Sequence, residues 1–173
     1  ILFNTNGTAP VSKFEKLLSH FKQIFLNVSI DAFGERDEHI RQGTKWKIKD
    51  KNFKDYVTLQ KDLGRKKFRV EINPTIQTLN IGYFDELYDY GQEMNVIVFP
   101  QNIVNVPTKY SALNLPQKIK KQYMKKLETF QLTPVNGVLQ SPKGNHKEFK
   151  KLLNEEIKKP NFLNLWPEFE EYC

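Results

Sequence analysis

Short polar side chains follow each of four apolar segments that have the length of β-strands. Hydroxyl, amide and carboxylate groups can bind a polar ligand through hydrogen bonds. The same residue types form turns wherever strands end, so each group taken alone indicates a turn rather than a site. Taken together, with Ser29 still inside its segment and Asp31 just past it, they favour a polar pocket. The groups occupy residues 4–8, 29–31, 73–77 and 100–102.

The elements that must position these groups alternate between strands and helices. Apolar runs predict strands at about 1–4, 24–30, 67–73 and 94–100, and the nearly continuous run at 24–30 is typical of a strand covered on both faces. Apolar residues at helical spacing predict helices at about 12–22, 53–63, 80–91, 116–130 and 145–157. Strand alternating with helix indicates an α/β fold with about four parallel strands. The polar groups would then meet at the carboxyl edge of the sheet.

Three local signals set the expected helix ends. Ser12 lies three residues before Glu15, which is the spacing of a capping box. Asn80 is placed to cap the third helix, and Gly91 to close it.

Composition and charge exclude several classes of protein. The 173 residues are 39% hydrophobic, which supplies a core and excludes disorder of the whole chain. No apolar run approaches the ~18 residues that span a membrane, so we expect no membrane partner and a cytoplasmic location. The net charge of +7 permits nucleic-acid binding but does not favour it, because the lysines are spread along the chain without an arginine-rich block.

Metal ligands are scarce. The single cysteine, Cys173, excludes a disulfide scaffold and a thiolate metal site made by this chain alone. The three histidines are scattered and lack the spacing of zinc ligands. We therefore expect no metal ligand among these residues.

Several motifs resemble the radical S-adenosylmethionine superfamily, in particular its members with a shortened auxiliary domain called twitch, relatives of the SPASM group. Thr5-Asn6-Gly7 is similar to the triplet that ends the third strand of the partial (β/α)6 barrel in that family. Ser29-Ile30-Asp31 is similar to the Ser-x-Asp that ends the fourth strand in that family. Arg41 and Gly43 resemble the Arg-Gly pair that follows soon after it. Weaker likenesses to the fifth-strand end, the sixth-strand exit and the tail of these proteins lie at 73–80, 105–107 and 165–169.

The resemblance implies a fold and an activity. Residues 1–130 would be the C-terminal portion of a partial (β/α) barrel, and residues 131–173 a helical and irregular extension packed on it. In the family a [4Fe–4S] cluster cleaves S-adenosylmethionine reductively to a 5′-deoxyadenosyl radical, which abstracts hydrogen from a substrate. The Cys-x3-Cys-x2-Cys loop that holds this cluster is absent here. We expect those cysteines in upstream sequence and the chain alone to be inactive; a homologue that never binds a cluster remains open.

The resemblance also implies roles for individual residues. Asp31 would accept hydrogen bonds from the ribose hydroxyls, and Arg41 would bind the methionyl carboxylate with its planar fork. Gly7 would allow close approach of the ligand to the backbone. The alternative is a purely structural role, in which Asp31 only ends a turn and Arg41 pairs with a surface carboxylate of Glu35, Asp37 or Glu38. The full set of expected S-adenosylmethionine contacts is Thr5, Asn6, Gly7, Ser29, Asp31, Arg41, Asn73, Thr75 and Gln77.

Two other functions stay open. The same polar edge could serve a non-catalytic binding module, or the chain could be a basic protein associated with nucleic acid. The resemblance leaves the substrate and the oligomeric state open, because family members act on peptides, sugars, lipids and nucleic acids.

Overall fold

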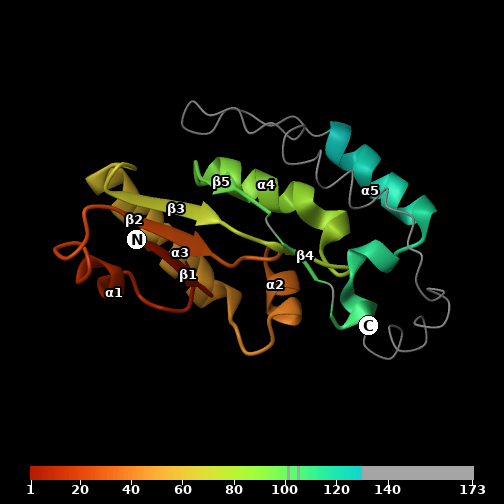
Figure 1. Cartoon of the computed structure of the whole chain (residues 1–173), viewed down its shortest axis with the longest axis horizontal. Helices are drawn as coiled ribbons and strands as arrows, with labels where there is room; N and C mark the ends of the chain where they lie inside the picture. The colour runs from red at the N-terminus through yellow and green to blue at the C-terminus, as the bar shows by residue number, and fades with distance from the viewer. Residues whose placement is uncertain (101, 105, 130–173) are drawn as a thin grey trace.

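A sheet of four parallel strands forms the centre of the computed structural model, which describes residues 1–100, 102–104 and 106–129 (Figure 1). The strands are β1 (Leu2–Thr5), β2 (Ile24–Val28), β3 (Phe68–Ile72) and β5 (Ile97–Val98), and they lie in the order β1-β2-β3-β5. This chain-order arrangement is consistent with part of a (β/α) barrel. The predicted α/β class, with four parallel strands alternating with helices, is confirmed.

The other elements surround this sheet. The helices are α1 (Ser12–Glu15), α2 (Glu35–Ile40), α3 (Trp46–Leu63), α4 (Phe84–Glu93) and α5 (Gln117–Thr129). A second, two-stranded parallel sheet pairs β4 (Thr75–Ile76) with β6 (Asn102–Ile103). Short 3-10 turns lie at Ile81–Tyr83, Thr108–Tyr110 and Ala112–Asn114.

One face of the main sheet packs against α1, α3 and α4. Phe14 of α1 contacts the rings of Phe3, Tyr56 and Phe68, which joins β1, α3 and β3 in one core. Gly91 of α4 lies against Val98 of β5. The helices therefore gather on the face that carries the alternate strand residues Ile24, Leu26, Val28, Phe68, Val70 and Ile72, all fully buried.

The opposite face is not an apolar packing face. The run at 24–30 predicts a strand covered on both faces, but Phe25 and Ser29 are only half-buried, and β2 ends at Val28. Asn27 donates from Nδ2 to Asn4 Oδ1 at 3.2 Å and lies in register with Glu71 of β3. Arg69 forms an ion pair with Glu71 on this same face. The face is nevertheless partly covered, since Asn27 is 8% exposed. It differs from the expectation in being largely polar, because Asn27, Arg69 and Glu71 of neighbouring strands lie on it.

Several helix ends differ from the predicted ones. α1 stops at Glu15 instead of about 22, because the chain continues in turns bonded three residues apart, such as Leu17 N–H to the Phe14 carbonyl at 2.9 Å. The residue before α1 is Val11, and no side chain caps the helix, so the capping box is wrong. α3 starts seven residues before its expected beginning at 53, since the Glu38 carboxylate accepts the Trp46 N–H at 2.6 Å.

Two predictions about α4 are also wrong, and β5 begins later than the predicted strand at 94–100. Asn80 does not cap the helix, and Gly91 lies inside α4, which runs on to Glu93. β5 is limited to two residues because Asn95, with φ of 55°, still belongs to the turn that follows α4. Pro116 precedes α5 directly and its carbonyl accepts the Ile119 N–H at 2.9 Å, as expected for a first turn. The helix expected from 145 and the extension at 131–173 lie outside the described residues.

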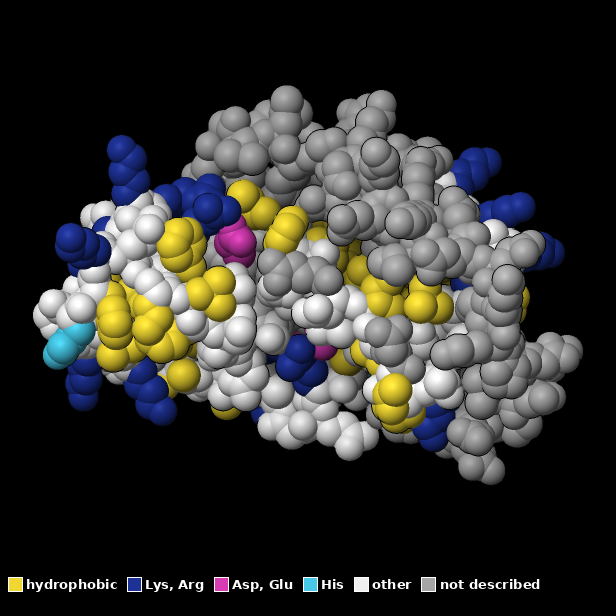
Figure 2. Space-filling view, in the orientation of Figure 1, with side chains coloured by type: hydrophobic (Ala, Val, Ile, Leu, Met, Phe, Trp, Pro, Cys, Tyr) yellow, Lys and Arg dark blue, Asp and Glu magenta, His cyan; other side chains and the backbone are white. Residues whose placement is uncertain are grey.

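The surface shows no single basic region on the face drawn in Figure 2, where Lys and Arg side chains stand at both ends and in the middle. Hydrophobic side chains gather over the part of that face where β1 to β3 lie in Figure 1. Leu2 of β1 is 57% exposed, and within the described residues β1 pairs with β2 alone. None of the helices in the described ranges has the length and apolar character needed to cross a membrane.

Candidate functional site

The carboxyl ends of β1, β2 and β3 lie side by side. Ser29 N–H donates to the Thr5 carbonyl at 2.8 Å, and Asn73 N–H donates to the Val28 carbonyl at 2.9 Å. The Thr-Asn-Gly and Ser-x-Asp tips therefore share one edge of adjacent parallel strands, as the sequence predicts.

Asp31 is the centre of this edge and is 4% exposed. Its Oδ1 accepts the Thr75 N–H at 2.7 Å, which joins the loop after β2 to β4. Its Oδ2 lies 2.7 Å from Arg41 Nε in an ion pair. The two residues expected to hold opposite ends of a ligand thus contact each other, and Arg41 does not pair with Glu35, Asp37 or Glu38 among the described ion pairs.

The two terminal guanidinium nitrogens of Arg41 remain available for a ligand. Its side chain is 26% exposed, and its two terminal nitrogens make no hydrogen bond to any residue in the described part of the chain. The Asp31 carboxylate attracts the guanidinium by charge, although Nε makes no hydrogen bond within the described residues. The terminal nitrogens can still bind a carboxylate through two parallel hydrogen bonds.

Asn80 ties the loops together. It is 1% exposed, and its Nδ2 donates to the Asp31 carbonyl at 2.9 Å and to the Thr75 carbonyl at 2.8 Å. Its Oδ1 accepts the Gln77 N–H at 2.8 Å. Sequence reasoning assigned this asparagine to a helix cap and missed its role, because its partner at Asp31 is 49 residues away.

A buried ion pair supports the edge from the helix side. Asp37 Oδ1 accepts the Asp31 N–H at 2.9 Å and the Ala32 N–H at 3.4 Å, while Oδ2 lies 2.5 Å from Lys49 Nζ. The side chains of Asp37 and Lys49 are both fully buried. Burial lowers the pKa of the Lys49 ammonium below its ordinary value, and the Asp37 carboxylate opposes that decrease.

Sequence reasoning missed this pair, although one signal was present. Lys49 lies three residues after Trp46 and four before Phe53, so it occupies the apolar face of its helix. A lysine at such a position is rarely buried without a partner of opposite charge. The spacing points to a buried lysine, but it does not identify Asp37.

The Thr-Asn-Gly turn rests on α3. Gly7 has φ of +81° and is buried, and a Cβ built on it would lie 2.8 Å from Lys49 Cγ. Asn52 Nδ2 donates to the Gly7 carbonyl at 3.0 Å, and the Gly7 N–H donates to Thr5 Oγ1 at 3.2 Å. Glycine is required here because φ is positive and a side chain of α3 comes close.

Four of the nine expected residues have side chains without a hydrogen-bond partner. They are half-buried, and their polar side-chain atoms make no hydrogen bond within the described residues: Ser29, Asn73, Thr75 and Gln77. Asn6 differs, because it is exposed and its side-chain oxygen accepts the Thr8 N–H and hydroxyl at 3.1 and 2.7 Å. The four half-buried side chains are available to a polar ligand.

The described residues do not fit an iron–sulfur cluster. They contain no group of three or more His, Cys, Asp or Glu side chains that could hold a metal ion. The arrangement at the edge is suited to hydrogen bonding and charge pairing with an organic ligand.

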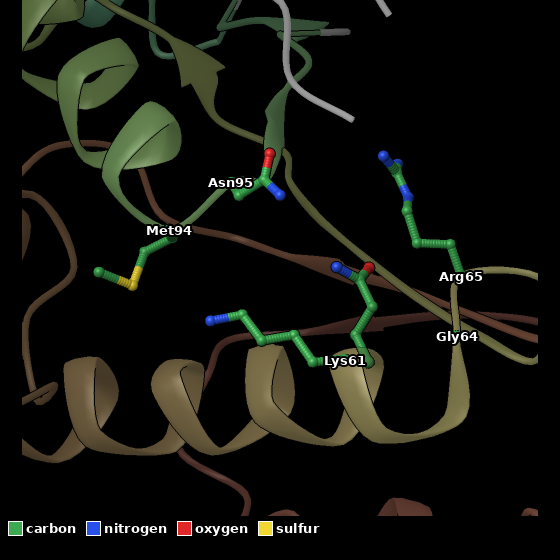
Figure 3. A pocket seen from close by; sticks show the side chains of 6 residues that line it. Lys61, Gly64, Arg65, Met94 and Asn95 are labelled. Carbon is green, nitrogen blue, oxygen red and sulfur yellow. The ribbon is translucent and has the colours of Figure 1, made fainter. Parts of the chain in front are cut away.

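A separate hollow of about 210 Å³ lies at the opposite edge of the sheet (Figure 3). It is lined by Gln60, Lys61, Gly64, Arg65, Met94 and Asn95, from the end of α3 and the turn before β5. In Figure 3 the side chains of Lys61 and Arg65 extend in different directions and do not converge on one point. Gln60 already accepts the Val70 N–H at 2.7 Å. The α3 carboxyl end also disfavours an anion there, so we do not assign the site to this hollow.

Comparison with protein-family models, with curated proteins and with solved structures finds no match for this chain.

Proposed function

We propose that the edge around Asp31 binds S-adenosylmethionine, and that the chain is part of a radical S-adenosylmethionine enzyme with a twitch-like tail. The observation that supports this most is the juxtaposition of Asp31, Arg41 and Ser29 beside the Thr5 turn on two adjacent parallel strands. The motifs that carry the family resemblance are thereby neighbours in space.

The side chains suit the groups of the ligand. Asp31 Oδ1 accepts the Thr75 N–H, and Oδ2 lies in the ion pair with Arg41 without a hydrogen bond from Nε. Each oxygen therefore retains an acceptor position for a ribose hydroxyl. Because this carboxylate is almost fully removed from water, hydrogen bonds to it are strong. The Arg41 terminal nitrogens would bind the methionyl carboxylate, and the Ser29 hydroxyl a further polar group.

The iron–sulfur chemistry belongs outside these residues. The chain holds one cysteine, so the three thiolates that the proposal requires must come from sequence beyond it. A cluster bound there would supply the electron, and the residues described here would bind and orient the cofactor. The substrate is not assigned.

Titration calorimetry of the 173-residue chain with S-adenosylmethionine tests the proposal. We expect saturable binding that Asp31→Ala weakens by about 1–3 kcal/mol, which is about 5- to 150-fold in Kd. Glu35→Ala removes an exposed carboxylate four residues away and is expected to leave Kd unchanged. Circular dichroism checks that both variants fold.

The absence of saturable binding, or an unchanged Kd in Asp31→Ala, would remove this edge from the cofactor site. Binding by the chain alone fits both an enzyme fragment and a non-catalytic binding module. Three cysteines spaced three and two residues apart in the gene upstream of Ile1 would favour the enzyme.

A further inference from the structure

The buried ion pair of Asp37 and Lys49 contacts both loops of the candidate site. Asp37 binds the loop after β2 through the backbone N–H groups of Asp31 and Ala32. Lys49 packs its aliphatic stem against Gly7, in the loop after β1. One ion pair, with Nζ and Oδ2 2.5 Å apart, thus joins two segments that are 24 residues apart at Gly7 and Asp31.

The Asp37 side of the pair fixes the direction of Asp31. Two backbone N–H groups donate to a single carboxylate oxygen, at 2.9 and 3.4 Å, and this restrains the peptide from which the Asp31 side chain extends. The Asp31 carboxylate then meets the Thr75 N–H and Arg41 on its other side. Without the Asp37 acceptor, the Asp31 N–H would lack a partner in a buried environment.

The Lys49 side of the pair fixes the Thr5–Gly7 turn. The position of a Cβ on Gly7 would lie within 2.8 Å of Lys49 Cγ and 3.3 Å of Lys49 Cε, so the turn rests directly on this stem. Asn52, three residues further along α3, binds the Gly7 carbonyl. A lysine tethered at Nζ to Asp37 is a fixed support rather than a flexible chain.

Stability alone does not explain why charges are placed here. A buried ion pair usually contributes no more to folding than a well-packed apolar pair of the same size, because both charges lose their hydration. What an apolar pair cannot do is accept two backbone N–H groups. The charged pair therefore restrains the two loops in a way that an apolar pair could not, although burying it costs hydration free energy.

We propose that Asp37 and Lys49 are positioning residues that couple the Thr5–Gly7 and Asp31 loops and thereby set the affinity of the edge for its ligand. The inference rests on the proposed function for the identity of that ligand, S-adenosylmethionine. The coupling of the loops is a property of the chain itself and can be measured without ligand.

Two double variants separate positioning from packing. Asp37→Asn with Lys49→Met removes both charges but keeps an amide oxygen that can accept the Asp31 N–H. Asp37→Leu with Lys49→Met keeps apolar volume and removes that acceptor. A matched control on the same helix is Asp55→Asn with Lys51→Met, an ion pair at 2.7 Å whose lysine side chain is 74% exposed.

Three readouts are made on the full chain: the urea midpoint of unfolding, the Kd for S-adenosylmethionine and amide hydrogen exchange of Asp31 and Ala32 by NMR. We expect the control to bind within threefold of wild type. The amide-retaining variant should bind more weakly than wild type but more tightly than the acceptor-free one, because it keeps the acceptor for the Asp31 N–H and loses the Lys49 tether. The acceptor-free variant is expected to bind at least tenfold more weakly, with at least tenfold faster exchange at Asp31. Its unfolding midpoint should fall below that of wild type, because the Asp31 and Ala32 N–H groups lose their buried acceptor.

Wild-type exchange and wild-type Kd in the folded acceptor-free variant would overturn the inference. If that variant does not fold, the amide-retaining variant decides: the Asp31 and Ala32 amide proton resonances should move upfield as a carboxylate acceptor becomes a neutral one, and unchanged resonances contradict the inference. If wild type fails to bind S-adenosylmethionine, the proposed function is refuted, while hydrogen exchange still decides whether the pair holds the loop.

Discussion

The glycine at position 7 gives a sharp test of how the candidate site is built. A Cβ on Gly7 would lie 2.8 Å from Lys49 Cγ and 3.3 Å from Val28 Cγ1, and its φ of +81° is unfavourable for any residue with a side chain. The Lys49 stem cannot swing aside, because its ammonium is 2.5 Å from the buried Asp37 carboxylate. Gly7→Ala is therefore expected to strain both the backbone and the packing.

The two effects differ in size and can be separated. A left-handed conformation costs a residue with a Cβ about 1–2 kcal/mol. Inserting a methyl group into a filled space costs about 1–3 kcal/mol more. We therefore expect Gly7→Ala to lower the free energy of unfolding by about 2–5 kcal/mol, a large fraction of the stability of a domain of this size.

Urea denaturation followed by circular dichroism measures this change. Gly43→Ala is the matched control, because Gly43 has φ of +87° and a Cβ on it would meet nothing within 4 Å. It should lose only the backbone part, about 1–2 kcal/mol. Equal losses in the two variants would show that Lys49 does not press on the Thr5–Gly7 turn, and would refute the packing argument.

Three further outcomes are expected. Gly91→Ala should destabilise the chain by about 2–4 kcal/mol in urea denaturation, because its Cβ would overlap Val98 Cγ2; Val98→Ala should relieve part of that loss. Burial raises the pKa of Tyr56 to about 12, so its folded state retains a proton that the unfolded state releases above about pH 10. Stability should fall between pH 10 and 12, and the fall should be shallower in Tyr56→Phe; an unchanged slope contradicts this. Binding of a fluorescent DNA duplex should be weak and vanish by ~150 mM salt, because the lysines are spread along the sequence without an arginine-rich block; retention at that salt would favour a nucleic-acid function.

Local patterns were sufficient to predict the strands of the sheet. The alternation of Phe68, Val70 and Ile72 predicts β3, and all three are fully buried. The run around Leu26 predicts β2, although not its polar face. These patterns succeed because strand burial depends mainly on the periodicity of the strand itself.

Helix ends were predicted less well, because distant groups decide them. The start of α3 depends on Glu38, eight residues before Trp46. The hydrogen bond from the Trp46 N–H also holds the pKa of Glu38 below its ordinary value. The spacing of apolar residues within the helix cannot predict that hydrogen bond.

The candidate site divides in the same way. Residues that end strands could be predicted from sequence, so the place of Asp31 and Ser29 at the carboxyl edge of the sheet was predicted. The supporting residues Asp37, Lys49 and Asn80 could not be assigned, since their partners lie 5 to 49 residues away along the chain. Among these, the lysine on an apolar helix face was the visible signal.

The outer edge of β1 has a consequence for how the chain behaves in solution. The bonds to β2 use the carbonyls of Ile1 and Thr5, so the backbone groups of the alternate residues Leu2 and Asn4 face away from the sheet. Within the described residues no strand pairs with this edge, so a strand from another molecule could add there, beside a leucine that is more than half exposed. Self-association of the isolated chain should therefore rise with protein concentration, and a charged residue in place of Leu2 would be the simplest way to suppress it.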